Sequence, residues 1–190
     1  MRINGERMLS DLNALRAITD TPGEGVTRFS YSEKDREARD YITRAAESAG
    51  FVLRTDAVGN MFIRFADGAR QIDEGSSAAG NDVYNGAKRI VVGSHIDTVR
   101  NGGWLDGVYG VAAGLEAMRA LSEEGVTDLP LELVIFAEEE GSNFGSTMTG
   151  SKFITGIYDR EDLDRLQNEQ GMSLRQMLKR CGYPEYKKEE

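Results

Sequence analysis

Two short apolar runs, separated by a helical pattern, place the strongest constraint on the fold of this chain. Residues 89–94 and 131–137 are rich in β-branched and other apolar side chains, as strands buried in parallel sheets are. Residues 108–124 between them carry apolar side chains at helical spacing. Strand, helix and strand over this length predict a βαβ crossover, and therefore an α/β fold with a mainly parallel sheet.

The remaining segments add helices and strands around this unit. Residues 57–60 form a predicted turn, so the strands that flank it are either a hairpin or two sequential strands. Residues 67–87 are rich in Gly, Ser, Asn and Asp, which predicts a mobile surface loop. Helices are expected at 5–18, from Ser32 to Gly50, and at about 151–156, 161–167 and 173–181, and further strands at 51–55 and 61–65.

Composition excludes several classes of protein. A net charge of -9 disfavours nucleic acid and anionic membranes as partners. No apolar run approaches the ~20 residues that span a bilayer, and the first residues lack the apolar core of a signal peptide. The single cysteine excludes an intrachain disulfide and favours a reducing compartment. We therefore expect a cytoplasmic protein.

Polar side chains that could bind metal follow both predicted strands. His95, Asp97 and Asp106 come after the first strand, and Glu138–Glu140 come after the second. Taken singly, a histidine is more often packed than a ligand, an Asp-Gly pair is commonly a turn or helix cap, and a charge run is usually solvated. Taken together they leave the same edge of one sheet, where open α/β folds bind ligands.

A mixed set of nitrogen and oxygen ligands suits Zn²⁺, Mn²⁺ or Co²⁺. An aspartate shared by two ions would clamp and activate a water molecule, and a neighbouring glutamate that is not a ligand could take the proton of that water. Asp97 could hold the second ring nitrogen of His95 and fix its tautomer.

At these residues the chain resembles the amidase/hydantoinase/carbamoylase family of metal-dependent hydrolases, which includes allantoate amidohydrolase, N-carbamoyl-L-amino acid hydrolase and ureidoglycolate-type enzymes. The resemblance implies a three-layer sandwich, the catalytic domain of metallo-aminopeptidases and carboxypeptidases. It rests on GVTR at 25–28, DAVGN at 56–60, GSHIDTV at 93–99, NGGWLDGVYGV at 101–111, AEEEGSNF at 137–144 and GSK at 150–152.

The resemblance also implies roles for individual residues. His95 would bind one divalent ion, Asp106 would bridge two, and Glu140 would bind the second. Glu139 would be the general base and Asp97 would orient His95. The base and ligand labels could shift by one residue within the run 138–140. The ions would be Zn²⁺ or Mn²⁺, with Co²⁺ or Ni²⁺ as alternatives. Thr27 and Arg28 would help to shape the substrate side.

The chain departs from the family in length and in histidine content. Family members are longer, with further metal-binding histidines downstream and a lid domain that forms a homodimer. This chain has one histidine, so residues 1–190 would be the N-terminal part of a truncated catalytic domain without the lid. Each ion would keep two protein ligands where about three are typical. We therefore expect the isolated chain to be inactive or nearly so.

Three functions remain open at this point. The first is hydrolysis of linear amide, ureide or amidine C–N bonds outside peptides, with allantoate or N-carbamoyl-L-amino acids as small-molecule substrates. The Glu-Glu-Glu-Gly-Ser sequence at 138–142 favours it over the second, a metal-dependent exopeptidase or aminoacylase. The third is a non-catalytic remnant, or one half of a split enzyme.

Overall fold

A computed structural model describes residues 2–66 and 89–186, which form one open sheet flanked by helices. The strands lie in the order β1-β2-β4-β3. The elements are α1 (Gly5–Ala17), α2 (Glu33–Glu47), β1 (Phe51–Thr55), β2 (Met61–Phe65), β3 (Ile90–His95), α4 (Val108–Glu123), β4 (Leu131–Phe136), α5 (Thr149–Ile154), α6 (Asp162–Arg165) and α7 (Leu174–Arg180).

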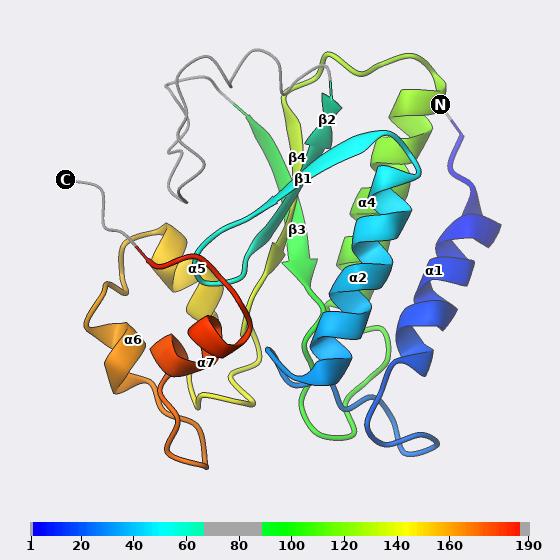
Figure 1. Ribbon diagram of the computed structural model, residues 1–190. Coiled ribbons are helices and arrows are strands. Elements are labelled where there is room, and N and C mark those ends of the chain that lie inside the picture. Colours follow the sequence, from blue (N-terminus) through cyan, green and yellow to red (C-terminus); the bar gives the residue numbers. More distant parts are fainter. Residues whose placement is uncertain (1, 67–88, 187–190) are drawn as a thin grey trace.

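Helices lie on both sides of the sheet. In Figure 1, α1, α2 and α4 stand on one side, while α5, α6 and α7 gather on the other. The larger apolar core fills the space between the first three helices and the sheet, with Leu15, Ile42, Leu115, Ile63 and Leu133 among its buried side chains. This arrangement confirms the predicted α/β fold and its layers.

The predicted βαβ unit is present. β3 and β4 are parallel neighbours, and α4 connects them and packs on both. The hairpin alternative is correct for the two early strands, because β1 and β2 pair antiparallel. β2 also pairs antiparallel with β4. The sheet of the described residues is therefore mixed, not mainly parallel, because the short turn after β1 reverses the chain and β2 then runs opposite to β4.

The prediction that residues 90–92 are buried was wrong. Ile90, Val91 and Val92 expose 54%, 47% and 36% of their surface. β3 is the edge strand of the described sheet, so it has a hydrogen-bonded neighbour on one side only. β-branched residues suit an edge strand as well as a central one, and composition alone does not separate the two.

Three further predictions concern the start of α2, membrane-spanning segments and residues 67–87. Ser32 caps α2, because its side chain accepts a hydrogen bond from the Asp35 backbone N–H. Within the described residues, none of the helices has the length and apolar character needed to cross a membrane. The loop predicted at 67–87 lies outside the described residues.

A buried asparagine ties the β1–β2 turn to the end of β4. Asn60 Oδ1 accepts the Ala137 backbone N–H at 2.9 Å, and Asn60 Nδ2 donates to Asp56 Oδ2 at 2.7 Å. Nδ2 also lies 3.2 Å from the Gly150 carbonyl oxygen. The Asn60 side chain thus joins the β1–β2 turn, the residue that follows β4 and the start of α5.

Replacing Asn60 by Ala should destabilise the fold. The Ala137 N–H would stay buried without an acceptor, which costs ~1–3 kcal/mol. Urea denaturation followed by circular dichroism measures the loss, with Asn13→Ala, on the exposed face of α1, as the matched control. Equal stability of the two variants would contradict this role for Asn60.

Candidate metal centre

The parallel register of β3 and β4 brings two polar segments together. His95 is the last residue of β3 and lies opposite Phe136, the last residue of β4. The chain then continues into Asp97 from one strand and into the run Glu138–Glu140 from the other. Both segments therefore leave the sheet side by side at its carboxyl edge, as the sequence predicts.

Three of the predicted residues converge on one point. His95, Asp106 and Glu140 each offer a ligand atom, and these atoms lie within 4.8 Å of one another. His95 is buried, Glu140 is half-buried and Asp106 is exposed. A nitrogen and two carboxylate oxygens gathered in this way form a group that could hold a metal ion.

The loop that carries Asp106 can reach His95 only because a glycine follows it. Gly107 has a φ of +64°, and a Cβ atom there would lie 2.5 Å from the His95 ring. Gly107 is also the N-cap of α4, and no side chain caps that helix. Asp106 is therefore not a helix cap, and its carboxylate remains available to the cluster.

Asp97 connects the two sides of the cluster. The Nδ1 atom of His95 lies 3.0 Å from the Asp97 backbone oxygen and 3.6 Å from its carboxylate Oδ1. The backbone oxygen, not the carboxylate, is thus the closer partner of the ring. Oδ2 of the same carboxylate accepts the Glu140 backbone N–H at 3.0 Å. The other ring nitrogen, Nε2, lies 3.5 Å from Glu139 Oε2.

The three glutamates of the run have different surroundings. Glu138 is fully buried, and its Oε1 accepts backbone N–H groups from Asn143 at 3.0 Å and Phe144 at 2.6 Å. Glu139 is partly exposed, with Oε2 3.5 Å from His95 Nε2. Glu140 belongs to the cluster. The Glu138 side chain is therefore bound to the backbone of the loop that follows it, whereas Glu139 and Glu140 face His95.

Without a cation, this edge carries more negative than positive charge. Burial raises the pKa of Glu138 to about 7, and the Asp97 carboxylate adds to this effect. Burial and the nearby Asp106 carboxyl raise the pKa of Glu140, against the opposing effect of His95. Carboxylates that repel each other in this way are stabilised by a bound cation.

Sequence reasoning misplaced one residue near the site. Arg28 was expected on the substrate side, but its side chain is 0% exposed and lies beneath the loop after β3. The reasoning also missed Ser30, whose Oγ accepts the Glu138 backbone N–H at 2.9 Å. Neither residue lies on an amphipathic stripe, so no periodic signal indicated that its side chain is buried.

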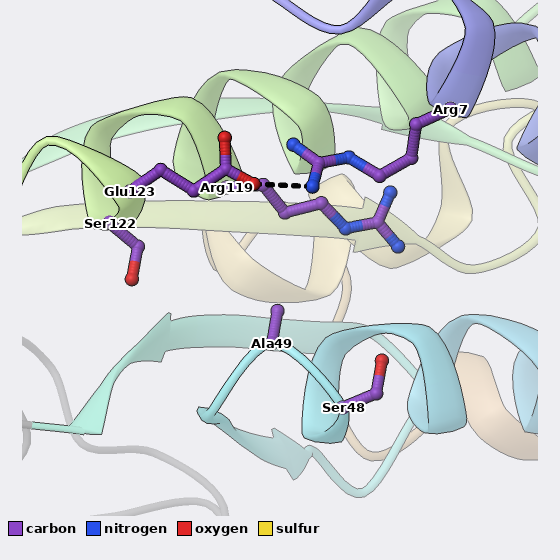
Figure 2. Close-up of a pocket in the computed structure, with 6 residues that line it drawn as sticks. All are labelled: Arg7, Ser48, Ala49, Arg119, Ser122 and Glu123. Atoms are coloured by element: carbon purple, nitrogen blue, oxygen red, sulfur yellow. Dashed lines mark hydrogen bonds and ion pairs between the residues drawn. The ribbon is translucent and has the colours of Figure 1, made fainter.

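A polar hollow of about 250 Å³ lies away from this edge, between α1, α4 and the end of α2 (Figure 2). Its two arginines already have acidic partners. Arg7 pairs with Glu123 and with the buried Glu116, and Arg119 pairs with the buried Asp11. These contacts tie α1 to α4, and the hollow offers no histidine, so we treat it as structural.

Comparison with known proteins agrees with this geometry. Residues 91–179 match Peptidase family M20/M25/M40. The chain is 35% identical to N-carbamoyl-L-amino acid amidohydrolase from Geobacillus stearothermophilus over 95% of the chain and 40% of that protein. It is 38% identical to allantoate amidohydrolase from Bacillus subtilis, over 84% of the chain and 35% of that protein.

A solved structure confirms the fold and the predicted resemblance. The crystal structure of a hydantoinase/carbamoylase family amidase from Burkholderia ambifaria matches with a TM-score of 0.80 and 36% identity, over 95% of this chain and 41% of that one. The chain thus spans about two fifths of the length of these relatives. Enzymes of the M20 family depend on metal, which agrees with the cluster at His95.

The protonation of His95 should make the stability of the fold depend on pH. Burial lowers the pKa of the imidazole, but hydrogen bonding to Asp97 and the charges of Asp97 and Glu139 outweigh it, so the pKa rises from 6.5 to about 9. The stabilisation that His95 contributes should therefore be complete below pH 6.5 and lost as the pH rises through about 9.

Because His95 is the one histidine of the chain, NMR of the metal-free protein gives a single imidazole titration. Its midpoint should be near pH 9. The difference in unfolding free energy between the wild type and His95→Gln should disappear over the same range. A midpoint at or below the ordinary histidine value would contradict the ion pairing described here.

Proposed function

We propose that this chain supplies metal-binding and general-base residues of a hydrolase that cleaves linear amide, ureide or amidine C–N bonds outside peptides. N-carbamoyl-L-amino acids and allantoate are the proposed class of substrate. The observation that carries the proposal is the convergence of His95, Asp106 and Glu140 within 4.8 Å, beside Glu139. The names of the relatives support the choice of bond.

The three converging residues are the proposed metal ligands. His95 would hold one ion and Glu140 a second, with Asp106 between them. Zn²⁺ and Mn²⁺ fit this donor set best, and Co²⁺ and Ni²⁺ are alternatives. Such ions, when bound, polarise a substrate carbonyl and lower the pKa of water. Asp97 would orient His95 and the Glu140 backbone through the contacts described above.

Glu139 is the proposed general base. Its carboxylate is partly exposed and lies next to His95 without belonging to the converging set. From there it can take a proton from the attacking water and deliver it to the leaving nitrogen. Glu138 is less suited to this role, because backbone N–H groups occupy its Oε1 inside the loop.

Catalytic metal sites typically provide about three protein ligands for each ion. The described cluster provides fewer than this for each of two ions. The relatives are more than twice as long as the chain, which agrees with further ligands outside these 190 residues. We propose that residues 1–190 form the N-terminal part of a catalytic domain. A lid domain that forms a homodimer would complete it, in a cytoplasmic enzyme.

Metal binding tests the site independently of activity. The wild-type chain should bind Co²⁺ or Zn²⁺ in calorimetry and in the visible spectrum of Co²⁺. Replacing His95 by Ala or Glu140 by Gln should weaken binding by more than the ~100-fold upper range for groups that only support a ligand. Glu139→Gln is the matched control and should keep wild-type affinity. Unchanged affinity in His95→Ala would disprove the site.

Substrate hydrolysis tests the class of bond. The isolated chain, with added Zn²⁺ or Mn²⁺, should show little or no turnover. Joined to the remaining part of the Geobacillus stearothermophilus relative, it should hydrolyse N-carbamoyl-L-amino acids or allantoate and leave dipeptides intact.

In that fusion, Glu139→Gln should reduce kcat by ~10²–10⁴-fold, the usual contribution of a general base. Activity on dipeptides alone would favour an exopeptidase. A folded fusion that binds metal but hydrolyses none of these compounds would favour a non-catalytic remnant.

A further inference from the structure

A short segment before α2 runs alongside the loop that leads from His95 to Asp106. Val26 and Gly102 exchange two backbone hydrogen bonds, of 3.0 and 2.8 Å. Next along the segment, the Asn101 backbone N–H donates to Thr27 Oγ1 at 2.8 Å. We call residues 26–28 the strap, because they hold the loop at several successive points.

Thr98 provides the innermost of these contacts. Its backbone N–H donates to the Arg28 carbonyl oxygen at 3.0 Å, and its Oγ1 accepts the Arg28 backbone N–H at 2.9 Å. The same Oγ1 donates to the Val26 carbonyl oxygen at 2.9 Å. Both residues are buried, so these bonds are shielded from competing water.

The side chain of Arg28 extends the strap to the residue between His95 and Asp97. Its Nε donates to the Ile96 carbonyl oxygen at 2.7 Å. Its Nη1 donates to the carbonyl oxygens of Leu15 and Ile18, at 2.7 and 2.8 Å, at the end of α1. The guanidinium therefore links α1 to the peptide that leaves β3.

Burying an arginine on carbonyl groups is costly, and burial lowers the pKa of Arg28. A planar group with several fixed donors can satisfy three carbonyl groups at once, which a lysine ammonium cannot do in the same geometry. The peptide held in this way lies between the proposed ligand His95 and Asp97, whose carboxylate holds the Glu140 backbone.

We propose that Arg28 is a positioning residue of the metal centre. Through the Ile96 carbonyl it sets the orientation of His95 and Asp97, and so the distance between the ligand atoms from β3 and those from β4. The inference rests on the metal site proposed above, but it concerns the geometry of His95 and can be measured without metal.

The test compares Arg28→Met with Arg39→Met. Arg39 is also a buried arginine, donating to Asp35 at 2.9 Å and to the Gly59 carbonyl oxygen at 2.6 Å, and no contact links it to residues 95–106 in the described structure. Both variants should lose stability in urea denaturation. Only Arg28→Met should change the ring ¹⁵N and ¹³C–¹H signals of His95 in the metal-free protein at fixed pH.

Co²⁺ binding provides the second measurement. Arg28→Met should bind Co²⁺ ~10-fold or more weakly than the wild type, the range found for groups that orient a ligand. Arg39→Met should keep wild-type affinity. Arg28→Lys carries the same test if Arg28→Met does not fold. It should change the His95 signals less than Arg28→Met does, since the ammonium keeps the charge and one donor nitrogen.

The outcomes separate this inference from the proposed function. If folded Arg28 variants keep the wild-type His95 signals and Co²⁺ affinity, the inference is wrong while the metal site stands. If the wild type does not bind Co²⁺, the metal site fails, and the NMR comparison still decides whether Arg28 positions His95. Equal changes of the His95 signals in the Arg39 control would also overturn the inference, because they would reflect a general loss of stability.

Discussion

The parallel pairing of β3 with β4 is the constraint on which the rest of this structure depends. It sets His95 opposite Phe136, so the two segments that follow these residues start side by side although forty residues separate them. Two parallel strands need a crossover between them, and α4 both supplies it and covers the sheet. The strand topology alone therefore brings the imidazole of His95 close to the carboxylates that follow β4.

The same edge shows how the fold holds groups that repel each other. Asp97 and Glu138 are both buried, and one oxygen of each carboxylate has no hydrogen-bond partner in the described residues. Backbone N–H groups from Glu140, Asn143 and Phe144 hold the other oxygens. Loop closure thus offsets part of the cost of burying these charges, and a cation beside His95 would offset more of it.

Patterns of apolar residues predicted the elements well. Periodicity predicted the strands at 51–55 and 61–65 and the βαβ unit, and the rule for open sheets placed His95, Asp106 and the run 138–140 at one edge. The choice of Glu140 within that run came from the family resemblance. The exposure of residues 90–92 was not predicted, because strand order depends on pairing across the whole sheet. The burial of Arg28 was also unreadable, since its partners are carbonyl oxygens that every sequence possesses.

The run Glu138–Glu140 shows why identical neighbours need a structure to tell them apart. Glu138 has a φ of +50°, which turns the chain sharply, and its side chain points inward to the backbone of residues 143 and 144. Its neighbours then project on the side of His95. A non-glycine residue in this conformation is held by its surroundings, and here the Ser30 hydroxyl and two backbone N–H groups hold it. The inward turn at the first glutamate thus separates it from Glu139 and Glu140, which both face His95.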